Sequence, residues 1–357
     1  MNTIIGKISD NNVEENVSVL ERAGEIIRRG GLVAFPTETV YGLGADALQE
    51  KAAAAIYAAK GRPSDNPLIV HIADFDALYG IVSRVPDTAV RLAEKFWPGP
   101  LTMVFDKADC VPEATTGGLN TVAVRFPSHN TAREFIRRSG RYIAAPSANL
   151  STRPSPTSAA HVIEDMQGRI DMILDEGSRG VMGLESTIVD VTGKIPVLLR
   201  PGFVTPDMLR DVVGRVDVDR VITATCVEEI GDEKPKAPGM KYRHYAPRGE
   251  LILFRGDVSA VVGEIRRRAT DSAARGRKVG IIASAETEPY YRGLGEILSV
   301  GERTNPDEIA KNLFAVLREF DDRNVDVIFG ETFFGEGLGL AIMNRLVKAS
   351  GYTVLDV

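Results

Sequence analysis

Residues 30–39 read GGLVAFPTET, and the apolar run at residues 32–35 is typical of a buried strand. A helical pattern precedes this run and ends at Gly30 and Gly31, where glycine suits the left-handed conformation of a helix C-cap. A helix, a tight turn and a strand in immediate succession predict a domain of the α/β or α+β class.

The same alternation of strand-like and helix-like patterns continues after this stretch. We predict strands at residues 68–72, 101–105, 121–126, 142–145, 170–174, 186–191 and 197–199. We predict helices at residues 50–60, 87–96, 129–139, 157–166 and 205–213. Because the interleaving is irregular, we expect a mixed, twisted sheet and not a plain repeat of βαβ units.

The pattern weakens between residues 214 and 248, where EKPKAPG at residues 233–239 is too rich in proline and charge for a core element. We therefore predict a first domain at residues 1–213, a linker at 214–248 and a second domain at 249–357. In the second domain we predict strands at 250–254, 278–283 and 325–329 and helices at 257–268, 306–320 and 338–349. This cleaner alternation predicts a small, doubly wound α/β domain with a mainly parallel sheet.

Composition excludes several classes of protein. The chain of 357 residues has a formal charge of −6, which speaks against indiscriminate binding of polyanions but is compatible with a local basic pocket. Cys110 and Cys226 are the only cysteines, so a disulfide framework, a zinc ribbon and a cysteine-held iron–sulfur site are excluded. The four histidines form no metal-binding pair on a helix, and we expect no transition metal held by protein side chains.

Membrane and secretion signals are also missing from the sequence. No apolar run reaches the roughly 18 residues of a membrane span, and the first residues lack the basic and apolar blocks of a signal peptide. A cytoplasmic protein without a membrane partner is therefore expected.

Glycine motifs give little support for a standard nucleotide cradle. No GxxxxGK[ST] occurs, so any ATP site would not be a P-loop. GLGADA at residues 42–47 matches a loose dinucleotide pattern, but residues 36–39 separate it from the preceding strand, and we reject it. For the glycines at residues 335–339, a tight turn and an anion-binding loop remain open alternatives.

Four cations stand at the ends of predicted elements. Lys60 and Arg62 lie where a helix ends, while Arg125 and Arg200 follow apolar strand residues. Cations in such places are positioned to converge on one anionic ligand, and the planar guanidinium group suits phosphate or carboxylate. For Lys60 and Arg62 the alternative is a solvated basic helix end that complements the helix dipole.

Small and hydroxyl-bearing residues mark two further strand ends. They are APSAN at residues 145–149 and LEST at residues 184–187, where a ligand can come close to the backbone. The alternative is purely structural, because Ser, Thr and Asn are also favoured as helix caps and in turns. His71, taken alone, is interpreted as a satisfied core histidine.

Nine segments carry more information together and in register than any one alone. They are FPTETVYGL at 35–43, KGRP at 60–63, NPL at 66–68, HI at 71–72, WPGPLT at 97–102, VRFP at 124–127, APSAN at 145–149, EST at 185–187 and LRPG at 199–202. This set resembles the YrdC-like domain of threonylcarbamoyl-AMP synthases. PGMKYRHYAP at residues 238–247 and the α/β pattern after it resemble the two-domain form of these enzymes. The resemblance implies an N-terminal YrdC-like twisted sheet with a concave basic pocket and a C-terminal Rossmann-like domain.

The resemblance also implies a reaction. L-threonine, bicarbonate and ATP would give threonylcarbamoyl-AMP and pyrophosphate, a nucleotidyl transfer that begins threonylcarbamoyladenosine modification of ANN-decoding tRNAs. ATP would be a substrate, with Mg²⁺ bound mainly through its triphosphate. A separate threonylcarbamoyl transferase would consume the adenylate, and weak direct binding of tRNA stays open.

Site residues follow from the same resemblance. The residues implied around L-threonine are Thr39, His71, Arg125, Ala145 and Ser186. Those implied around ATP are Lys60, Arg62, Asn66, Thr121, Ser147, Ser155, Arg200 and Tyr245. Thr37 remains an alternative to Thr39, because alternate residues of a strand would share one face.

We expect Arg125 to pair with the threonine carboxylate, and Lys60 and Arg62 to be the catalytic cations at the phosphates. Residues 236–247 are expected to form a lid that excludes water. Two rival functions are a carbamoyl-adenylate-forming carbamoyltransferase and an RNA-binding translation factor. Salt-dependent binding of tRNA without ATP turnover would favour the second rival.

Overall fold

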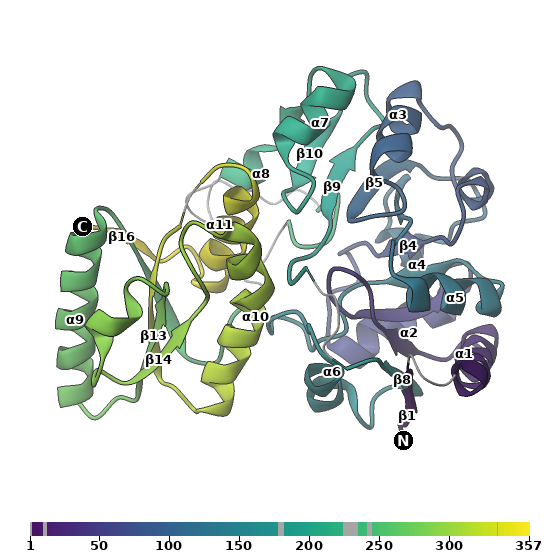
Figure 1. The fold of residues 1–357 in the computed structure, drawn as a ribbon. Helices are drawn as coiled ribbons and strands as arrows, with labels where there is room; N and C mark the ends of the chain where they lie inside the picture. Colours follow the sequence, from purple (N-terminus) through teal and green to yellow (C-terminus); the bar gives the residue numbers. More distant parts are fainter. Residues whose placement is uncertain (1, 10–12, 178–181, 224–234, 241–244, 334) are drawn as a thin grey trace.

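The computed structural model describes residues 2–9, 13–177, 182–223, 235–240, 245–333 and 335–357. The helices and strands in these ranges form two units that lie side by side, each built on its own sheet (Figure 1).

The first unit is built on a mixed sheet of eleven strands. The strands are β1 (Ile4–Lys7), β2 (Val33–Phe35), β3 (Gly42–Asp46), β4 (Ile69–His71), β5 (Leu101–Asp106), β6 (Thr121–Arg125), β7 (Ile143–Ala145), β8 (Met172–Asp175), β9 (Thr187–Asp190), β10 (Val197–Arg200) and β11 (Asp217–Val218). Their order in the sheet is β1-β8-β2-β3-β7-β4-β6-β5-β9-β10-β11. β4 and β6 run parallel, whereas β2 and β3 run antiparallel.

Helices cover both faces of this sheet. They are α1 (Val13–Arg28), α2 (Glu50–Lys60), α3 (Asp87–Phe96), α4 (Glu113–Thr116), α5 (Asn130–Ser139), α6 (Ala159–Met166), α7 (Pro206–Val213) and α8 (Arg220–Thr223), with a 3₁₀ turn η1 (Asp76–Gly80). Phe35 of β2 packs in a core with Ile27 of α1 and Phe135 of α5, while the alternate residue Ala34 packs in the core that contains α2 and α3. Because successive strand residues point to opposite faces, the two cores lie on opposite sides of the sheet.

The second unit has an all-parallel sheet of five strands in the order β14-β13-β15-β12-β16. The strands are β12 (Glu250–Arg255), β13 (Val279–Ala283), β14 (Glu296–Ser299), β15 (Val327–Glu331) and β16 (Val354–Asp356). The helices are α9 (Val258–Ala274), η3 (Glu288–Tyr291), α10 (Pro306–Asp322) and α11 (Leu338–Ala349). α9 covers one face, and α10 and α11 cover the other. This is a doubly wound arrangement, as the sequence predicts.

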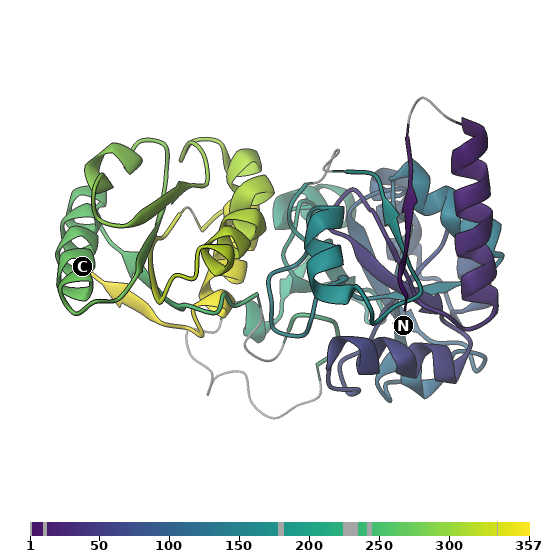
Figure 2. The ribbon, with the colours of Figure 1, turned by 90° about the horizontal axis from the view of Figure 1, so that it is seen from below.

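Helices α10 and α11 lie on the side of the second unit that faces the first (Figures 1 and 2). One hydrophobic core joins the two units across this boundary, because Val40, Leu184 and Tyr245 pack into the same cluster as residues of α10 and α11. Val40 and Tyr245 also line the pocket described below, so the second unit packs directly behind the pocket wall.

Sequence patterns predict most of the long elements. α3 spans residues 87–96 as expected, because its buried side chains Ala89, Leu92, Ala93 and Phe96 recur at helical spacing. Gly30 has the expected positive φ, at 82°. Strand β3 was not expected, and the rejected glycine motif lies largely inside it and not in a strand-to-helix turn.

The boundaries at residues 213 and 248 stay a prediction. β11 continues the first sheet past residue 213, and much of the expected linker, residues 224–234 and 241–244, lies outside the described residues. In the described part of the chain, none of the helices has the length and apolar character needed to span a membrane.

Candidate functional site

The loop between β2 and β3 forms one wall of a pocket. Thr37 and Thr39 are buried there, and their Oγ1 atoms are 2.9 Å apart. The expectation that these two residues share a strand face is wrong, because β2 ends at Phe35 and residues 36–41 lie in no strand, with a bend at 38–40. Proline at residue 36 cannot donate to a strand ladder, which favours the end of the strand there. Both threonines line the pocket, so the choice between them stays open.

His71 and Arg125 lie next to each other on the parallel strands β4 and β6. Arg125 Nη1 donates to Thr39 Oγ1 at 2.8 Å, and Nη2 lies 2.9 Å from Glu38 Oε1. Burial alone would raise the pKa of Glu38, but the charge of Arg125 and the Ser128 N–H hold it below its usual range. The cation is therefore partly neutralised before any substrate binds.

His71 is neutral in this environment. Burial, and then the nearby positive charge of Arg125, lower the pKa of His71 to about 3. Its Nδ1 lies 3.1 Å from the carbonyl oxygen of Ile69, which suits donation by an Nδ1–H. In that tautomer, Nε2 is an acceptor.

Arg200, at the end of β10, joins three pieces of the pocket. Nε and Nη2 donate to the backbone oxygen and Oγ of Ser186, at 3.0 and 3.2 Å. Nη1 donates to the carbonyl oxygen of Pro238, in the segment after the first unit, at 3.1 Å. Burial lowers the pKa of Arg200 to about 10, so the guanidinium remains charged at neutral pH.

Arg62 enters the pocket from the end of α2. Gly61 ends this helix in the left-handed conformation, with φ 62° and ψ 37°, and turns the chain toward the pocket. The Nη2 of Arg62 donates to the carbonyl oxygens of Asn66 and Pro67 at 3.2 and 3.1 Å. Its buried Nε has no hydrogen-bond partner among the described residues, which leaves a donor for a ligand.

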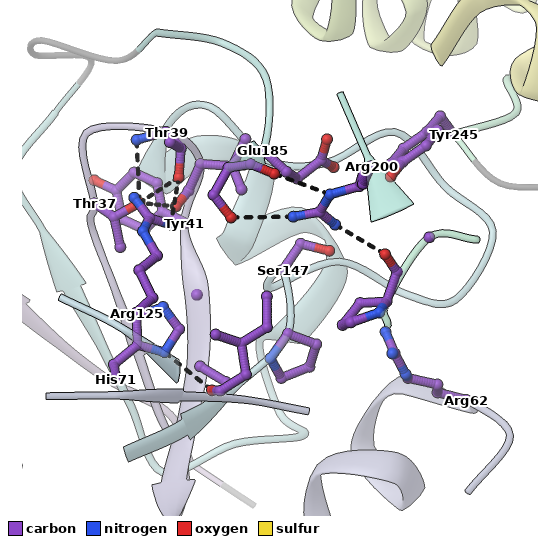
Figure 3. A pocket seen from close by; sticks show the side chains of 18 residues that line it. Thr37, Thr39, Tyr41, Arg62, His71, Arg125, Ser147, Glu185, Arg200 and Tyr245 are labelled. Carbon is purple, nitrogen blue, oxygen red and sulfur yellow. Dashed lines mark hydrogen bonds between the residues drawn. The ribbon is translucent and has the colours of Figure 1, made fainter. Parts of the chain in front are cut away.

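One pocket thus collects side chains from distant parts of the chain (Figure 3). Arg125 lies on one side of it and Arg62 and Arg200 on the other. Nine of the residues expected from the sequence line this pocket: Thr39, Arg62, His71, Arg125, Ala145, Ser147, Ser186, Arg200 and Tyr245. All five expected threonine contacts are among them.

Four expected ATP contacts do not line the pocket. Lys60 is buried behind it, with Nζ donating to the carbonyl oxygens of Ser147 and Asn149 at 2.5 Å each. Burial, and then the charge of Arg62, lower the pKa of Lys60 well below its usual range. Ser155 is also buried, and its Oγ donates to Glu185 Oε1 at 2.5 Å.

The other two expected contacts lie at the amino ends of neighbouring parallel strands. Thr121 begins β6, and Asn66 precedes β4 at nearly the same level of the sheet. Asn66 is buried, and its Oδ1 lacks a hydrogen-bond partner within the described parts of the chain. Of the two, Asn66 contacts Arg62, which donates to its backbone carbonyl oxygen.

Two further parts of the chain line the pocket. Glu185 stood in a quoted motif without a role, yet it lines the pocket as a buried carboxylate. Pro238 and Gly239 of the expected lid also line it. Within the described residues, no group of three or more His, Cys, Asp or Glu side chains is arranged to hold a metal ion.

Comparison with known proteins covers both units. A family model described as "Telomere recombination" matches residues 25–202, and one described as "Threonylcarbamoyl-AMP synthase, C-terminal domain" matches residues 204–351. A relative from Pyrococcus abyssi named "Threonylcarbamoyl-AMP synthase" is 47% identical over 97% of this chain and 98% of its own length. The chain belongs to the threonylcarbamoyl-AMP synthase family. It has the two-domain form of this family, because both models match it.

Other threonylcarbamoyl-AMP synthases agree with this placement. A relative of that name from Bacillus subtilis is 44% identical over 94% of both chains. The crystal structure of Pyrococcus abyssi Sua5 complexed with L-threonine matches with a TM-score of 0.90 and 44% identity, over 100% of each chain. The resemblance found in the nine sequence segments therefore extends to the entire fold.

Proposed function

We propose that the protein makes threonylcarbamoyl-AMP and pyrophosphate from L-threonine, bicarbonate and ATP. The observation that carries this proposal is the convergence of Arg62, Arg125 and Arg200 on one pocket. Among the described residues that line it, Glu185 is the one carboxylate, and it is paired with Arg345. The pocket therefore has an excess of positive charge, which suits anionic substrates.

The side of the pocket formed by Arg125 and His71 suits an amino acid. Arg125 would bind the carboxylate of threonine, and its buried Nε has no hydrogen-bond partner among the described residues. His71 is neutral and offers Nε2 as an acceptor for the amine. Thr39, Ala145 and Ser186 would complete the contacts with L-threonine.

The side formed by Arg62, Arg200 and Tyr245 would hold ATP, together with Ser147. Asn66, whose backbone accepts from Arg62, and Thr121, at the amino end of β6, would also contact ATP. Ser155 supports Glu185. Lys60 would act on the phosphates as a second cation. The three donors of the Lys60 ammonium are directed at the carbonyl oxygens of Ser147 and Asn149 and at Asn149 Oδ1, so direct contact with a phosphate requires exchange of one of these partners. Arg62 is therefore the better placed phosphate ligand.

The chemistry explains the need for several cations. The threonine amine and bicarbonate would form a carbamate with loss of water, and the carbamate oxygen would then attack the α-phosphorus as pyrophosphate leaves. Both reactants are anions, and they repel strongly in a dehydrated pocket. Fixed guanidinium groups reduce this repulsion and stabilise the charge on the departing pyrophosphate. No covalent intermediate with the protein is needed.

Three finer points belong to the same proposal. Mg²⁺ would enter with the triphosphate as part of the substrate. The segment that contains Pro238, Gly239 and Tyr245 would act as a lid that keeps water from the labile adenylate. A separate cytoplasmic transferase would carry the threonylcarbamoyl group to tRNA.

Pyrophosphate release tests the proposal. The purified protein is given ATP, Mg²⁺ and bicarbonate with L-threonine, L-serine, carbamoyl phosphate or no addition. We expect release that needs both L-threonine and bicarbonate. Release driven by carbamoyl phosphate would favour a carbamoyltransferase, and no release under any condition would reject the proposal.

A further inference from the structure

Helix α11 of the second unit carries two cations that are buried against the first unit. Arg345 is 0% exposed and Lys348 is 3% exposed. They are three positions apart, so they lie on the same side of the helix. Lys348 Nζ donates to the carbonyl oxygen of Gly239, which lines the pocket. The helix thus touches the pocket wall from behind.

The guanidinium of Arg345 connects three segments of that wall. Nε donates to Glu185 Oε2 at 2.9 Å, and Nη1 donates to the carbonyl oxygen of Pro201 at 2.8 Å. The guanidinium carbon lies 5.8 Å from the centre of the Tyr245 ring, within the range of a cation–π contact. Glu185 and Tyr245 line the pocket, and Pro201 directly follows Arg200.

Glu185 transmits this contact to the substrate-facing groups. Its other oxygen, Oε1, accepts from Ser155, so the carboxylate is held from two sides. Burial alone would raise the pKa of Glu185, but the charges of Arg345 and then Arg200 lower it to about 2. The next residue, Ser186, accepts two hydrogen bonds from Arg200. A displacement of Glu185 would therefore also move Ser186, the next residue, and with it the two hydrogen bonds that hold Arg200.

We propose that Arg345 is a positioning residue for the substrate pocket, through its contacts with Glu185, Pro201 and Tyr245. The pocket is complete only when the second unit is docked and supplies this guanidinium. The inference rests on the proposed function, because it assigns these wall segments to substrate binding.

A second buried arginine at the same boundary makes no direct hydrogen bond to any of the described residues that line the pocket. Arg318 of α10 is 1% exposed and pairs with Asp165 at 2.7 Å, and it also donates to the carbonyl oxygen of Pro154 at 2.6 Å. None of these three residues lines the pocket. Arg318 therefore joins the same two units without holding a pocket residue, and it is the matched control for Arg345.

The test compares Arg345→Met with Arg318→Met in the full chain. Pyrophosphate release gives kcat and KM for L-threonine and ATP, and thermal unfolding gives stability. We expect both variants to unfold at lower temperature than the wild type. Only Arg345→Met should lose kcat/KM strongly, by roughly 10²-fold, the effect expected of a displacement of about 1 Å in a site.

A pH profile gives a readout that loss of packing alone would not move. Without Arg345 the pKa of Glu185 rises, so the acid limb of kcat/KM should shift to higher pH in Arg345→Met. Glu185→Gln should remove this acid limb. Arg345→Met should also lower kcat/KM less when it is made in the Glu185→Gln variant than when it is made in the wild type. If Arg345→Met fails to fold, Glu185→Gln alone decides, and an unchanged KM for both substrates in that variant overturns the proposal.

The outcomes separate the inference from the function. A wild-type protein without threonine-dependent release would reject the proposed function. If the wild type is active, two results would reject the role of Arg345. One is an equal loss of kcat/KM in Arg345→Met and Arg318→Met, and the other is an acid limb that does not shift in Arg345→Met.

Discussion

Arg62 donates two hydrogen bonds to backbone carbonyls, and its buried Nε has no hydrogen-bond partner in the described part of the chain. Its orientation is therefore fixed before ATP arrives, which is the condition under which a cation stabilises a transition state most effectively. We expect Arg62→Ala to lower kcat by roughly 10²- to 10³-fold, as loss of an oxyanion donor does. Pyrophosphate release at saturating substrates measures this change.

Two variants control for trivial effects of removing Arg62. Arg62→Lys keeps the charge but loses the planar fork, and should recover part of the activity. Arg210→Ala removes an exposed arginine on α7 and should leave kcat unchanged. An unaltered kcat in folded Arg62→Ala would show that Arg62 does not act on the phosphates.

The burial of His71 predicts a pH dependence of stability. Its pKa is about 3 in the folded protein and 6.5 as an ordinary value. As the pH falls below 6.5, the unfolded chain binds a proton that the folded chain does not, so the folded state loses stability. The stabilising effect of neutral His71 is complete above this pH and declines by up to about 1.4 kcal/mol per pH unit on acidification.

Urea unfolding of wild type and His71→Gln between about pH 6 and 4 measures the contribution of His71 to the pH dependence of stability. The free energy of unfolding should depend less steeply on pH in the variant. His161→Gln should behave similarly, because burial lowers the pKa of His161 to about 4. Equal slopes in wild type and His71→Gln would show that His71 is not held neutral by the fold.

Among the elements, the segment at residues 235–240 depends on a close approach at Gly239. Gly239 has φ +79°, and an added Cβ would lie 2.8 Å from Tyr245 Oη and 3.5 Å from Arg200 Nη1. The approach to Tyr245 is a clash, whereas that to Arg200 is an ordinary contact, so Gly239→Ala should displace Tyr245 and lower kcat/KM for ATP by roughly 10- to 100-fold. Steady-state kinetics with varied ATP measure the effect.

Gly140→Ala separates the clash from backbone strain. Gly140 ends α5 at φ +61°, and an added Cβ there would meet nothing within 4 Å. Both variants should lose about 1–2 kcal/mol of unfolding free energy because alanine is strained in the left-handed conformation. Only Gly239→Ala should change kcat/KM. Equal kcat/KM for ATP in the two variants would show that the close approach at Gly239 is not needed for ATP binding.

The elements also show where sequence patterns stop being informative. α3 and α10 have apolar side chains at helical spacing, which makes them predictable from local sequence. β3 contains Gly42 and Gly44, which are poor strand residues, yet an added Cβ on Gly44 would lie 2.8 Å from Ile143 and 3.0 Å from Phe35. Packing between β2 and β7 therefore requires the glycines that hide the strand from prediction.

Some site residues were likewise predictable from local sequence, and others were not. Arg125 and Arg200 were identifiable because each ends an apolar strand, and strand ends converge at the edge of a sheet. Arg345 was not identifiable, because it lies inside an ordinary amphipathic helix and its partner Glu185 is 160 residues away in the sequence. Only the packing of the two units shows that this arginine lies behind the pocket wall and holds Glu185.

At the scale of the whole molecule, the two units are joined by buried charge as well as by a shared hydrophobic core. Arg318 and Asp165 are 1% and 2% exposed, and their ion pair crosses the boundary at 2.7 Å. Arg153 also contacts Asp165, and it lies 3.6 Å from Asp321 of α10. A buried network of this kind stabilises only while every charge keeps its partner.

Removal of Arg318 leaves Asp165 with Arg153 as its remaining ion-pair partner among the described residues. Breaking a buried pair from one side typically lowers stability by about 3–5 kcal/mol, so Arg318→Met should lose stability in that range. Urea unfolding measures the loss. Arg323→Met removes two partly exposed ion pairs at the end of the same helix and should lose much less. Because the pair joins two units, the loss of stability should appear in the unfolding of both units. The fluorescence of Trp97 reports on the first unit, and far-UV circular dichroism reports on the whole protein. If the first unit kept its wild-type midpoint in Arg318→Met, the units would be stable independently, and the docked pocket wall would owe its geometry to contacts other than this network.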